Sequence, residues 1–304
     1  MPVHDLGYRQ WSGTRMPRFL RPWVVARGGI SLVWRRRWLR MMLMLAWLPI
    51  AVPALAIFAF EYSSTDPEIR GVVVGMLRSP LIQRGDLAAQ VMVDPTSVRH
   101  EVWSILILFF FRYPQLVAMV MVVGLIAPML ISYDLRSKAY LMYFSRPLTP
   151  AEYILGKSAV VWFLLVMIVT VPALALYLLG VLLSPDLSVV IETWDIPLRV
   201  LAATVILVVP TTAVALCYSS FTSESRYATF AWFATWAMGG VAYRILTFAG
   251  QPPRFARSPG RPRGRRRIDN QQWEEWYNNI DYDKWRLLSP YDTLGKVEAW
   301  VLSL

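Results

Sequence analysis

The composition of the chain is that of a membrane protein. Hydrophobic residues make up 56% of its 304 residues, charged residues make up 17%, and the mean hydropathy is +0.42. This balance is far from that of a soluble domain, and the apolar residues are concentrated in long blocks. The net charge of +11 is unevenly distributed, so the charges between the blocks orient the chain.

The N-terminal arm, residues 1–40, is strongly basic. It holds nine arginines and one acid, Asp5, which predicts a cytoplasmic N-terminus. Within residues 18–40, apolar side chains recur at helical spacing between arginines, although two adjacent glycines weaken the pattern. We therefore expect an amphipathic helix in the membrane interface. No apolar run precedes Met41, so no cleaved signal peptide is expected.

The first membrane span is predicted at Met41–Phe60, which carries no charge. A helix rises ~1.5 Å per residue and a hydrocarbon core is ~30 Å thick, so this block is long enough to cross. Pro49 and Pro53 predict a kink within it. The next segment, Glu61–Glu101, holds six acids and four arginines, as expected of an external loop.

Arg112 interrupts the apolar sequence before the second span. The run Val102–Phe111 is apolar but too short to cross a membrane, and the second span is predicted at Leu116–Tyr133. Snorkelling at the outer interface accounts for Arg112 without any function. In the alternative interpretation, Arg112 and Gln115 face a translocation cavity and meet an anionic substrate.

The segment Ser132–Lys157 is a short charged stretch between two long uncharged ones. Tyr113–Tyr133 has no ionisable charge over 21 residues, and Ser158–Pro185 has none over 28. The segment holds four basic residues against two acids, which predicts a cytoplasmic loop.

The local chemistry of this loop predicts a helix, a stiff turn and a second helix. Asp134–Phe144 is expected to form the short first helix. Pro147 and Pro150 lie three residues apart, so no helix continues through them. Thr149 and Glu152 form a capping box around Pro150, and the helix that starts there is expected to reach about Leu183, roughly 50 Å. Its first two turns should protrude into the cytoplasm.

The stretch YDLRSKAYLMYFSRPLTPAEYILGK resembles the first cytoplasmic loop of type-2 ABC transporter permeases. In that family an acidic residue after a span is followed by a basic or small stretch, a proline turn and a motif that opens the next span. The matching positions are Asp134, Arg136, Ser145, Arg146, Pro147, Glu152, Tyr153, Leu155, Gly156 and Lys157. The spacing of the spans extends the likeness over residues 15–248.

The resemblance implies an all-α polytopic permease that is moved by a separate ATPase. The residues it assigns to coupling with that subunit are Asp134, Arg136, Tyr140, Arg146, Pro147, Thr149, Glu152, Tyr153, Gly156 and Lys157. ATP and magnesium would bind to the partner chain, and two permease copies, identical or paralogous, would enclose the pathway. In the family an amphipathic N-terminal helix touches the ATPase, so the N-terminal arm is either that contact or a plain anchor.

Three further spans follow the loop. They are predicted at Val160–Leu183, Val200–Tyr218 and Tyr227–Tyr243, which makes five spans in all. Pro185–Arg199, with three acids and one arginine, is expected outside, and the short turn 219–226 inside. Type-2 permeases usually have six spans, so either the sixth is missing or truncated, or the fold closes with five.

Three threonines within these spans are candidates to line a pathway: Thr170, Thr211 and Thr212. Hydrogen bonds within or between helices explain them equally well.

The tail after the fifth span departs from the alternation of charges. Seven arginines fall within Arg254–Arg267, a stretch that is either a solvated linker or a site for anionic lipid headgroups. Nucleic acid is not expected, because no reading element accompanies the arginines. The tryptophans of Gln271–Leu304 fit an element on the membrane interface. The sequence thus divides into an N-terminal arm (1–40), a transmembrane domain (41–248) and a tail (249–304).

No catalytic, metal or cofactor site is expected. His4 and His100 are far apart in sequence, and Cys217 is alone. No phosphate-binding loop or hydrolase motif occurs, so ATP hydrolysis would belong to a partner.

The sequence therefore predicts the membrane-spanning subunit of an ATP-binding cassette transporter in the plasma membrane, the inner membrane of a bacterium. Export is inferred from the resemblance alone, and the substrate is not identified. The alternative is a non-transporting membrane anchor or scaffold that recruits a cytoplasmic partner through the same basic surface.

Overall fold

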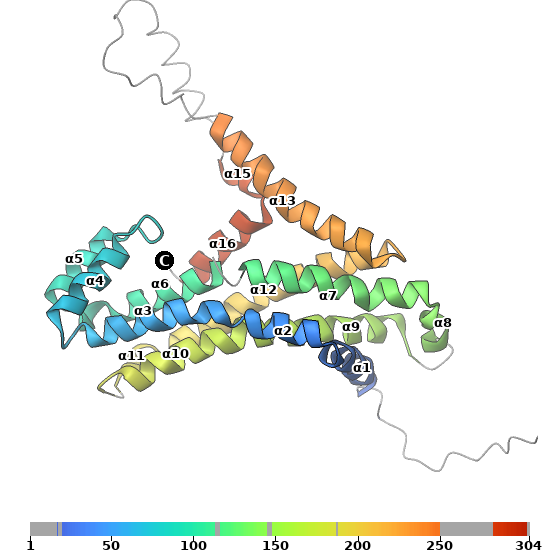
Figure 1. The fold of residues 1–304 in the computed structure, drawn as a ribbon, viewed down its shortest axis with the longest axis horizontal. Helices are drawn as coiled ribbons and strands as arrows, with labels where there is room; N and C mark the ends of the chain where they lie inside the picture. Colours follow the sequence, from blue (N-terminus) through green and yellow to red (C-terminus); the bar gives the residue numbers. More distant parts are fainter. Residues whose placement is uncertain are drawn as a thin grey trace, which may run out of the picture.

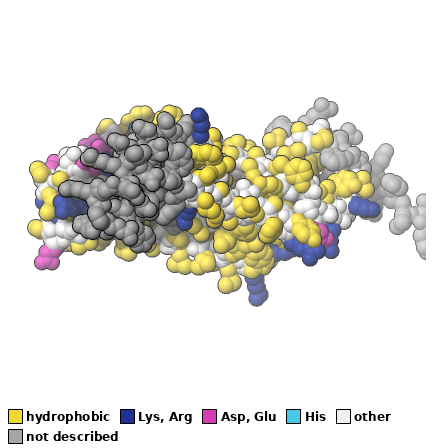
Figure 2. All heavy atoms as spheres, turned by 90° about the horizontal axis from the view of Figure 1, so that it is seen from above, with side chains coloured by type: hydrophobic (Ala, Val, Ile, Leu, Met, Phe, Trp, Pro, Cys, Tyr) yellow, Lys and Arg dark blue, Asp and Glu magenta, His cyan; other side chains and the backbone are white. Residues whose placement is uncertain are grey.

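The protein is a helical bundle drawn out along one axis. A computed structural model describes residues 17, 20–112, 116–144, 148–186, 188–249 and 282–302, and these form helices and no β-strand. Four described segments are long and apolar enough to cross a membrane: Arg37–Tyr62, Leu116–Arg136, Pro150–Leu183 and Asp195–Ser220. They run along the long axis (Figure 1). The visible face in Figure 2 is mainly hydrophobic across the middle of the molecule, as expected of a surface that faces lipid. The predicted all-α membrane fold is confirmed.

The first segment is helical in three parts. α2 (Arg37–Leu45) leads through a short 3-10 turn (Leu48–Ile50) into α3 (Ala51–Tyr62). Pro49 lies in that turn, where its missing N–H interrupts the α-helical ladder. The segment has 26 residues and includes Glu61, whose side chain is buried. The helix therefore continues past the predicted end of the span at Phe60, and Glu61 lies in this helix and not in the loop where the sequence placed it.

The third segment has the bounds that the sequence predicts. α9 (Pro150–Leu165), a π-helical turn (Val166–Thr170) and α10 (Val171–Leu183) form one continuous helix of 34 residues. The π turn lies just before Pro172, whose ring would collide with the carbonyl four residues earlier in a regular α-helix.

The second and fourth segments, α7 (Leu116–Arg136) and α12 (Asp195–Ser220), pack side by side. Pro128 lies inside α7. The Ser219 hydroxyl of α12 bridges the Pro128 carbonyl and the Ser132 N–H. Ser132 N donates to Ser219 Oγ at 3.1 Å, and Ser219 Oγ donates to Pro128 O at 3.1 Å. The Ser132 hydroxyl in turn donates to Ser219 O at 2.8 Å. These bonds fix the register of α7 against α12.

α13 (Ser225–Ala249) occupies the position of the predicted fifth span. It is 25 residues long, packs on α7 and α12, and slants away from the other long helices (Figure 1). It is less apolar than the four spanning segments, because it contains Arg244, a glycine pair and several tyrosines and tryptophans. The described residues thus give four spanning segments by apolar length, with α13 as a candidate fifth.

The segment predicted as an external loop is largely helical. It contains α4 (Pro67–Leu77), α5 (Gly85–Val93), a 3-10 turn (Thr96–Val98) and the start of α6 (Arg99–Phe110). α6 lies end to end with α7 along the long axis (Figure 1). The apolar run before Arg112 thus forms a half-length helix, consistent with its being too short to cross.

The remaining helices lie at the two ends and along one side of the bundle. α4, α5 and α11 (Val189–Glu192) lie at one end, and α1 (Arg21–Arg35) and α8 (Ala139–Phe144) lie at the other (Figure 1). We call these the α4 end and the α8 end. α15 (Tyr282–Arg286) and α16 (Pro290–Val301) pack along α13, and α16 also contacts α12. Most of the arginine-rich tail, 250–281, lies outside the described residues.

A buried ion pair joins α3 to α6 near the α4 end. Arg99 Nε lies 3.2 Å from Glu61 Oε1, and Trp103 Nε1 donates to the same oxygen at 2.9 Å. Both charged side chains are at most one-tenth exposed. Because each charge lacks water, each needs the other to remain in the bundle.

We expect Glu61→Ala to destabilise the protein by about 3–5 kcal/mol, since it leaves Arg99 buried without its counter-ion. Glu101→Ala is the matched control, because Glu101 pairs with Arg84 at 3.3 Å on the surface and should cost less than about 1 kcal/mol. Unfolding of the detergent-purified variants measures both. Equal losses would mean that the buried pair has no special role.

Candidate functional site

The charged connection between α7 and α9 lies at the α8 end. α7 ends at Arg136, and Lys138 then takes a left-handed backbone conformation with φ 54° before α8 begins. The single short helix predicted over Asp134–Phe144 is therefore wrong, because Lys138 divides it in two. Arg146 and Pro147, which the resemblance assigns to coupling, lie outside the described residues.

The start of α9 has the predicted capping box. Thr149 N donates to Glu152 Oε2 at 2.8 Å, and Glu152 N donates to Thr149 Oγ1 at 3.2 Å. Pro150 occupies the first turn, where its missing N–H costs nothing. Thr149, Pro150 and Glu152 together thus fix where the third segment begins.

Three of the residues assigned to coupling form a buried polar cluster. Lys157 Nζ lies 2.7 Å from Asp134 Oδ2, and the Tyr153 hydroxyl donates to the same oxygen at 2.8 Å. Lys157 Nζ also donates to Leu130 O at 2.7 Å. All three residues are less than one-tenth exposed. They bind α7 to α9 and do not lie on a surface that a partner could touch.

Gly156 lets α1 approach α9. A Cβ on Gly156 would lie 2.6 Å from Val25 Cβ and 2.8 Å from Pro22 O, so no larger residue fits there. The contact between α1 and α9 is the most extensive in the bundle. Gly156 therefore positions the N-terminal helix and is itself buried.

The other assigned residues that the structure describes are at least partly exposed. Arg136 has 68% of its side chain exposed, with Nη1 3.6 Å from Glu224 Oε2. Tyr140 and Glu152 are half-buried, and Thr149 is exposed. The described surface at the α8 end is thus formed by the end of α7, by α8 and by the first turn of α9.

The three threonines that were candidates to line a pathway differ in their hydrogen bonding. Thr170, in the π turn, donates to Thr204 Oγ1 at 3.2 Å, and Thr204 donates to Val200 O at 2.8 Å. This favours the helix-contact interpretation for Thr170. Thr211 and Thr212 are buried with hydroxyl oxygens that lack a hydrogen-bond partner among the described residues.

A cavity of about 530 Å³ adjoins Thr212. Tyr153, Ser158 and Trp162 of α9 line it together with residues of α12 and Ile131 of α7. It therefore reaches from the helix contacts at mid-bundle to the start of α9. Gln115, the remaining pathway candidate besides Arg112, lies outside the described residues.

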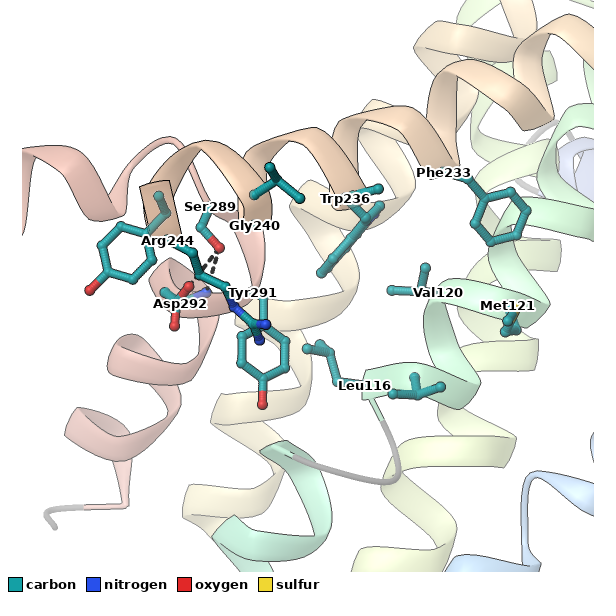
Figure 3. A pocket seen from close by; sticks show the side chains of 14 residues that line it. Leu116, Val120, Met121, Phe233, Trp236, Gly240, Arg244, Ser289, Tyr291 and Asp292 are labelled. Atoms are coloured by element: carbon teal, nitrogen blue, oxygen red, sulfur yellow. Dashed lines mark hydrogen bonds between the residues drawn. The ribbon is translucent and has the colours of Figure 1, made fainter. Parts of the chain in front are cut away.

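A second cavity, of about 420 Å³, lies between α7, α13 and α16 (Figure 3). We call it the α13 pocket. Leu116, Val120 and Trp236 give it mainly apolar walls, and Arg244 and Asp292 add charge at one side (Figure 3). Ser289 caps α16 there, with Ser289 Oγ donating to Asp292 Oδ2 at 2.7 Å.

Arg112 follows the end of α6, near the α13 pocket, and its side chain lies against α16. Its guanidinium is 5.1 Å from the centre of the Tyr291 ring, and Nη2 is 3.7 Å from Asp292 Oδ1. It lies so close to Gly295 that a side chain there would collide with it. Arg112 also lines a neighbouring cavity of about 340 Å³ together with Arg84, Arg286 and Lys296. Arg112 thus meets a helix of its own chain, with cavities on either side.

Comparison with known families decides the assignment. The profile of the "ABC-2 family transporter protein" matches residues 23–290, which is most of the chain. The chain belongs to this family. Neither the curated proteins nor the solved structures gave a match.

Membership confirms the resemblance to type-2 permeases. Proteins of the ABC-2 family are membrane subunits without an ATPase site of their own, and they generally work with an ATP-binding subunit. Together with the four apolar segments, the match identifies a multi-pass membrane protein of the permease class.

Sequence reasoning missed most of the polar contacts of this ABC-2 protein. Glu61, Asp134 and Lys157 were expected outside the predicted spans, yet all three are buried. Each lies at a predicted span boundary, where hydropathy alone cannot tell a buried charge from an exposed one. The pairing of Ser132 with Ser219 left no sequence signal either.

We expect Lys157→Met to destabilise the protein by about 3–5 kcal/mol, because the Asp134 carboxylate stays buried without its counter-ion. The double variant Asp134→Leu/Lys157→Met removes both charges and should recover most of the loss. Arg136→Ala, on the exposed surface, is the control and should change stability by less than about 0.5 kcal/mol. Thermal unfolding in detergent gives all three values, and a double variant as unstable as Lys157→Met would contradict the assignment.

The buried Glu298 of α16 makes the stability of the protein depend on pH. α16 is outside the four spanning segments, and the Glu298 side chain is 1% exposed with Oε1 lacking a hydrogen-bond partner among the described residues. Burial raises the pKa of Glu298 to about 7, and the nearby charge of Arg112 only partly opposes this. Folded protein then binds a proton that unfolded protein releases between pH 4.5 and 7, so stability falls as the pH rises through this window.

Glu298→Gln should flatten that slope, since glutamine carries no proton to release. We expect the wild type to lose on the order of 3 kcal/mol between pH 4.5 and 7.5 relative to the variant. Unfolding curves of both proteins across this range measure the difference. Glu101→Gln, at an exposed carboxylate, should keep the wild-type slope, and parallel curves for the wild type and Glu298→Gln would refute the assignment.

Proposed function

We propose that the chain is the permease subunit of an ATP-driven exporter and that its α8 end receives the ATP-binding subunit. The observation that carries this proposal is the arrangement of the α8 end within an ABC-2 protein. Two exposed residues, Arg136 and Thr149, and two half-buried ones, Tyr140 and Glu152, lie around a base that buried Asp134 and Lys157 hold together. A partner that pushes on this surface would move α7 and α9 as one unit.

The third segment is the element that would carry the displacement inward. It is continuous from Pro150 to Leu183, and its first turns lie at the α8 end. The capping box keeps its start from fraying. Force applied near Thr149 would therefore act on a rigid rod about 50 Å long.

The same proposal gives the orientation of the chain in the membrane. The α8 end holds the basic arm and the basic loop, so we assign it to the cytoplasm and α4 and α5 to the outside. The membrane is then the plasma membrane, and the N-terminus is cytoplasmic. α1 would lie in the inner interface, because it leaves the direction of α2 at Arg36 and exposes Trp23 and Trp34 (Figure 1).

The transport pathway would form between two copies of the chain. α13 would be the fifth span, and the α13 pocket beside it would lie on the outer half of the pathway, near Arg112. Thr211 and Thr212, whose buried hydroxyls lack partners among the described residues, remain the candidates on the inner half. ATP and magnesium would be bound by the partner subunit.

The direct test is purification of the tagged chain in detergent from its own host. We expect an ATP-binding subunit to co-purify, and Arg136→Glu or Arg146→Glu to lower its recovery roughly tenfold, which corresponds to ~1.4 kcal/mol. Arg78→Glu makes the same charge change on the exposed residue that follows α4, at the opposite end, and should leave recovery unchanged. Recovery of a different cytoplasmic protein without ATPase activity would instead favour a membrane scaffold.

A further inference from the structure

An apolar groove of about 420 Å³ lies between the bend joining α1 to α2 and the third segment. Leu43, Met44 and Trp47 form one wall, and Phe163 and Met167 form the other. Nothing in the proposed coupling or pathway uses this groove. Its width and apolar walls suit a hydrocarbon chain.

One arginine lines the same groove, and three more lie beside it in the sequence. Arg40 lines it, and Arg35, Arg36 and Arg37 follow directly after Trp34, another lining residue. Among the described residues, none of these four arginines makes an ion pair, and the sequence has no acid from residue 20 to residue 60. The groove therefore joins an apolar interior to the positive charge of Arg40, with three further positive charges next to Trp34 in the sequence.

Exposed tryptophans mark the depth of the groove in the membrane. Trp34, Trp38 and Trp47 are each more than one-third exposed, and tryptophan favours the level of the lipid headgroups. The groove thus begins at the membrane interface and extends toward the hydrocarbon core.

The groove is formed by fixed parts of the fold. Gly156 and Val160 of α9 hold α1 in place, since a Cβ on Gly29 would lie 2.6 Å from Val160 Cγ2. The opposite wall ends in the π turn, which is part of a continuous helix. A ligand would meet a preformed site and would not have to order a flexible arm.

We propose that this groove binds an anionic phospholipid, with one acyl chain along Leu43 and Met167 and the phosphate at Arg40 and the neighbouring arginines. Burial of methylene groups and charge neutralisation would both contribute to binding. The site stands on this geometry and does not require the proposed coupling. Only its assignment to the inner leaflet rests on the proposed orientation.

Charge argues against two other occupants. A second copy related by two-fold symmetry would bring the same four arginines against themselves. The chain's own residues 1–16 hold two arginines and one acid, so they carry no net negative charge to neutralise the arginines at the groove. An anionic headgroup supplies the negative charge that both lack.

The experiment is native mass spectrometry of the detergent-purified full chain incubated with equal amounts of phosphatidylglycerol and phosphatidylcholine. The wild type should retain phosphatidylglycerol in preference. Arg40→Gln should lower that retention about fivefold, the change expected for one basic residue at an anionic surface. Arg78→Gln, which removes the exposed arginine that follows α4, should have no effect.

A second variant tests the apolar part of the site. Met167→Trp, or Met44→Trp at the more exposed wall, places a bulky ring in the groove and should lower retention of both lipids. Equal retention of the two lipids by the wild type, or unchanged retention in Arg40→Gln, would overturn the proposal. So would a shift of oligomeric state in these variants without a change in lipid binding, because that result would assign the groove to a second copy.

Discussion

The ion pair between Asp134 and Lys157 is the constraint on which the α8 end of the bundle depends. Two opposite charges are buried on adjacent helices, and neither has access to enough water to remain charged alone. α7 and α9 can therefore neither slide nor separate at this level without breaking the pair. Tyr153 and the Leu130 carbonyl satisfy the remaining hydrogen-bonding capacity, so the cluster is complete within the protein.

This constraint extends to three helices because α1 packs on α9 at the same level. Gly156, one residue before Lys157, removes the side chain that would keep α1 away. The hydrogen bonds of Ser219 Oγ with Ser132 N and Pro128 O attach α12 to α7 and so to the same group of helices. α1, α7, α9 and α12 thus move as one body at the α8 end, which is what the proposed ATP-driven coupling requires. Both ends of the α7–α9 connection are anchored, so its middle can be pushed without unravelling the helices.

The sequence predicted what depends on local chemistry or on long apolar blocks. The helix Pro150–Leu183 and its capping box at Thr149 agree with the structure, because cap, proline and hydropathy all act within a few residues. Glu61 was misplaced because its burial depends on Arg99, far along the chain. The break at Lys138 depends on one backbone conformation that several residue types can adopt. Partners distant in sequence cannot be paired from one chain alone.

The α8 end of the bundle and the side that carries α16 are held by contacts of unequal strength. At the α8 end the polar contacts are short, buried and fully satisfied. Between α16 and the other helices they are fewer: Arg199 Nη1 donates to Leu302 O at 2.9 Å, but Arg112 is 3.7 Å from Asp292, and Glu298 keeps an unpaired oxygen among the described residues. Rearranging α16 would therefore break fewer strong interactions than rearranging α9. A bundle that is rigid where force would enter and looser beside the α13 pocket is suited to opening on the side of α16, and this asymmetry supports release of substrate there in the proposed direction of export.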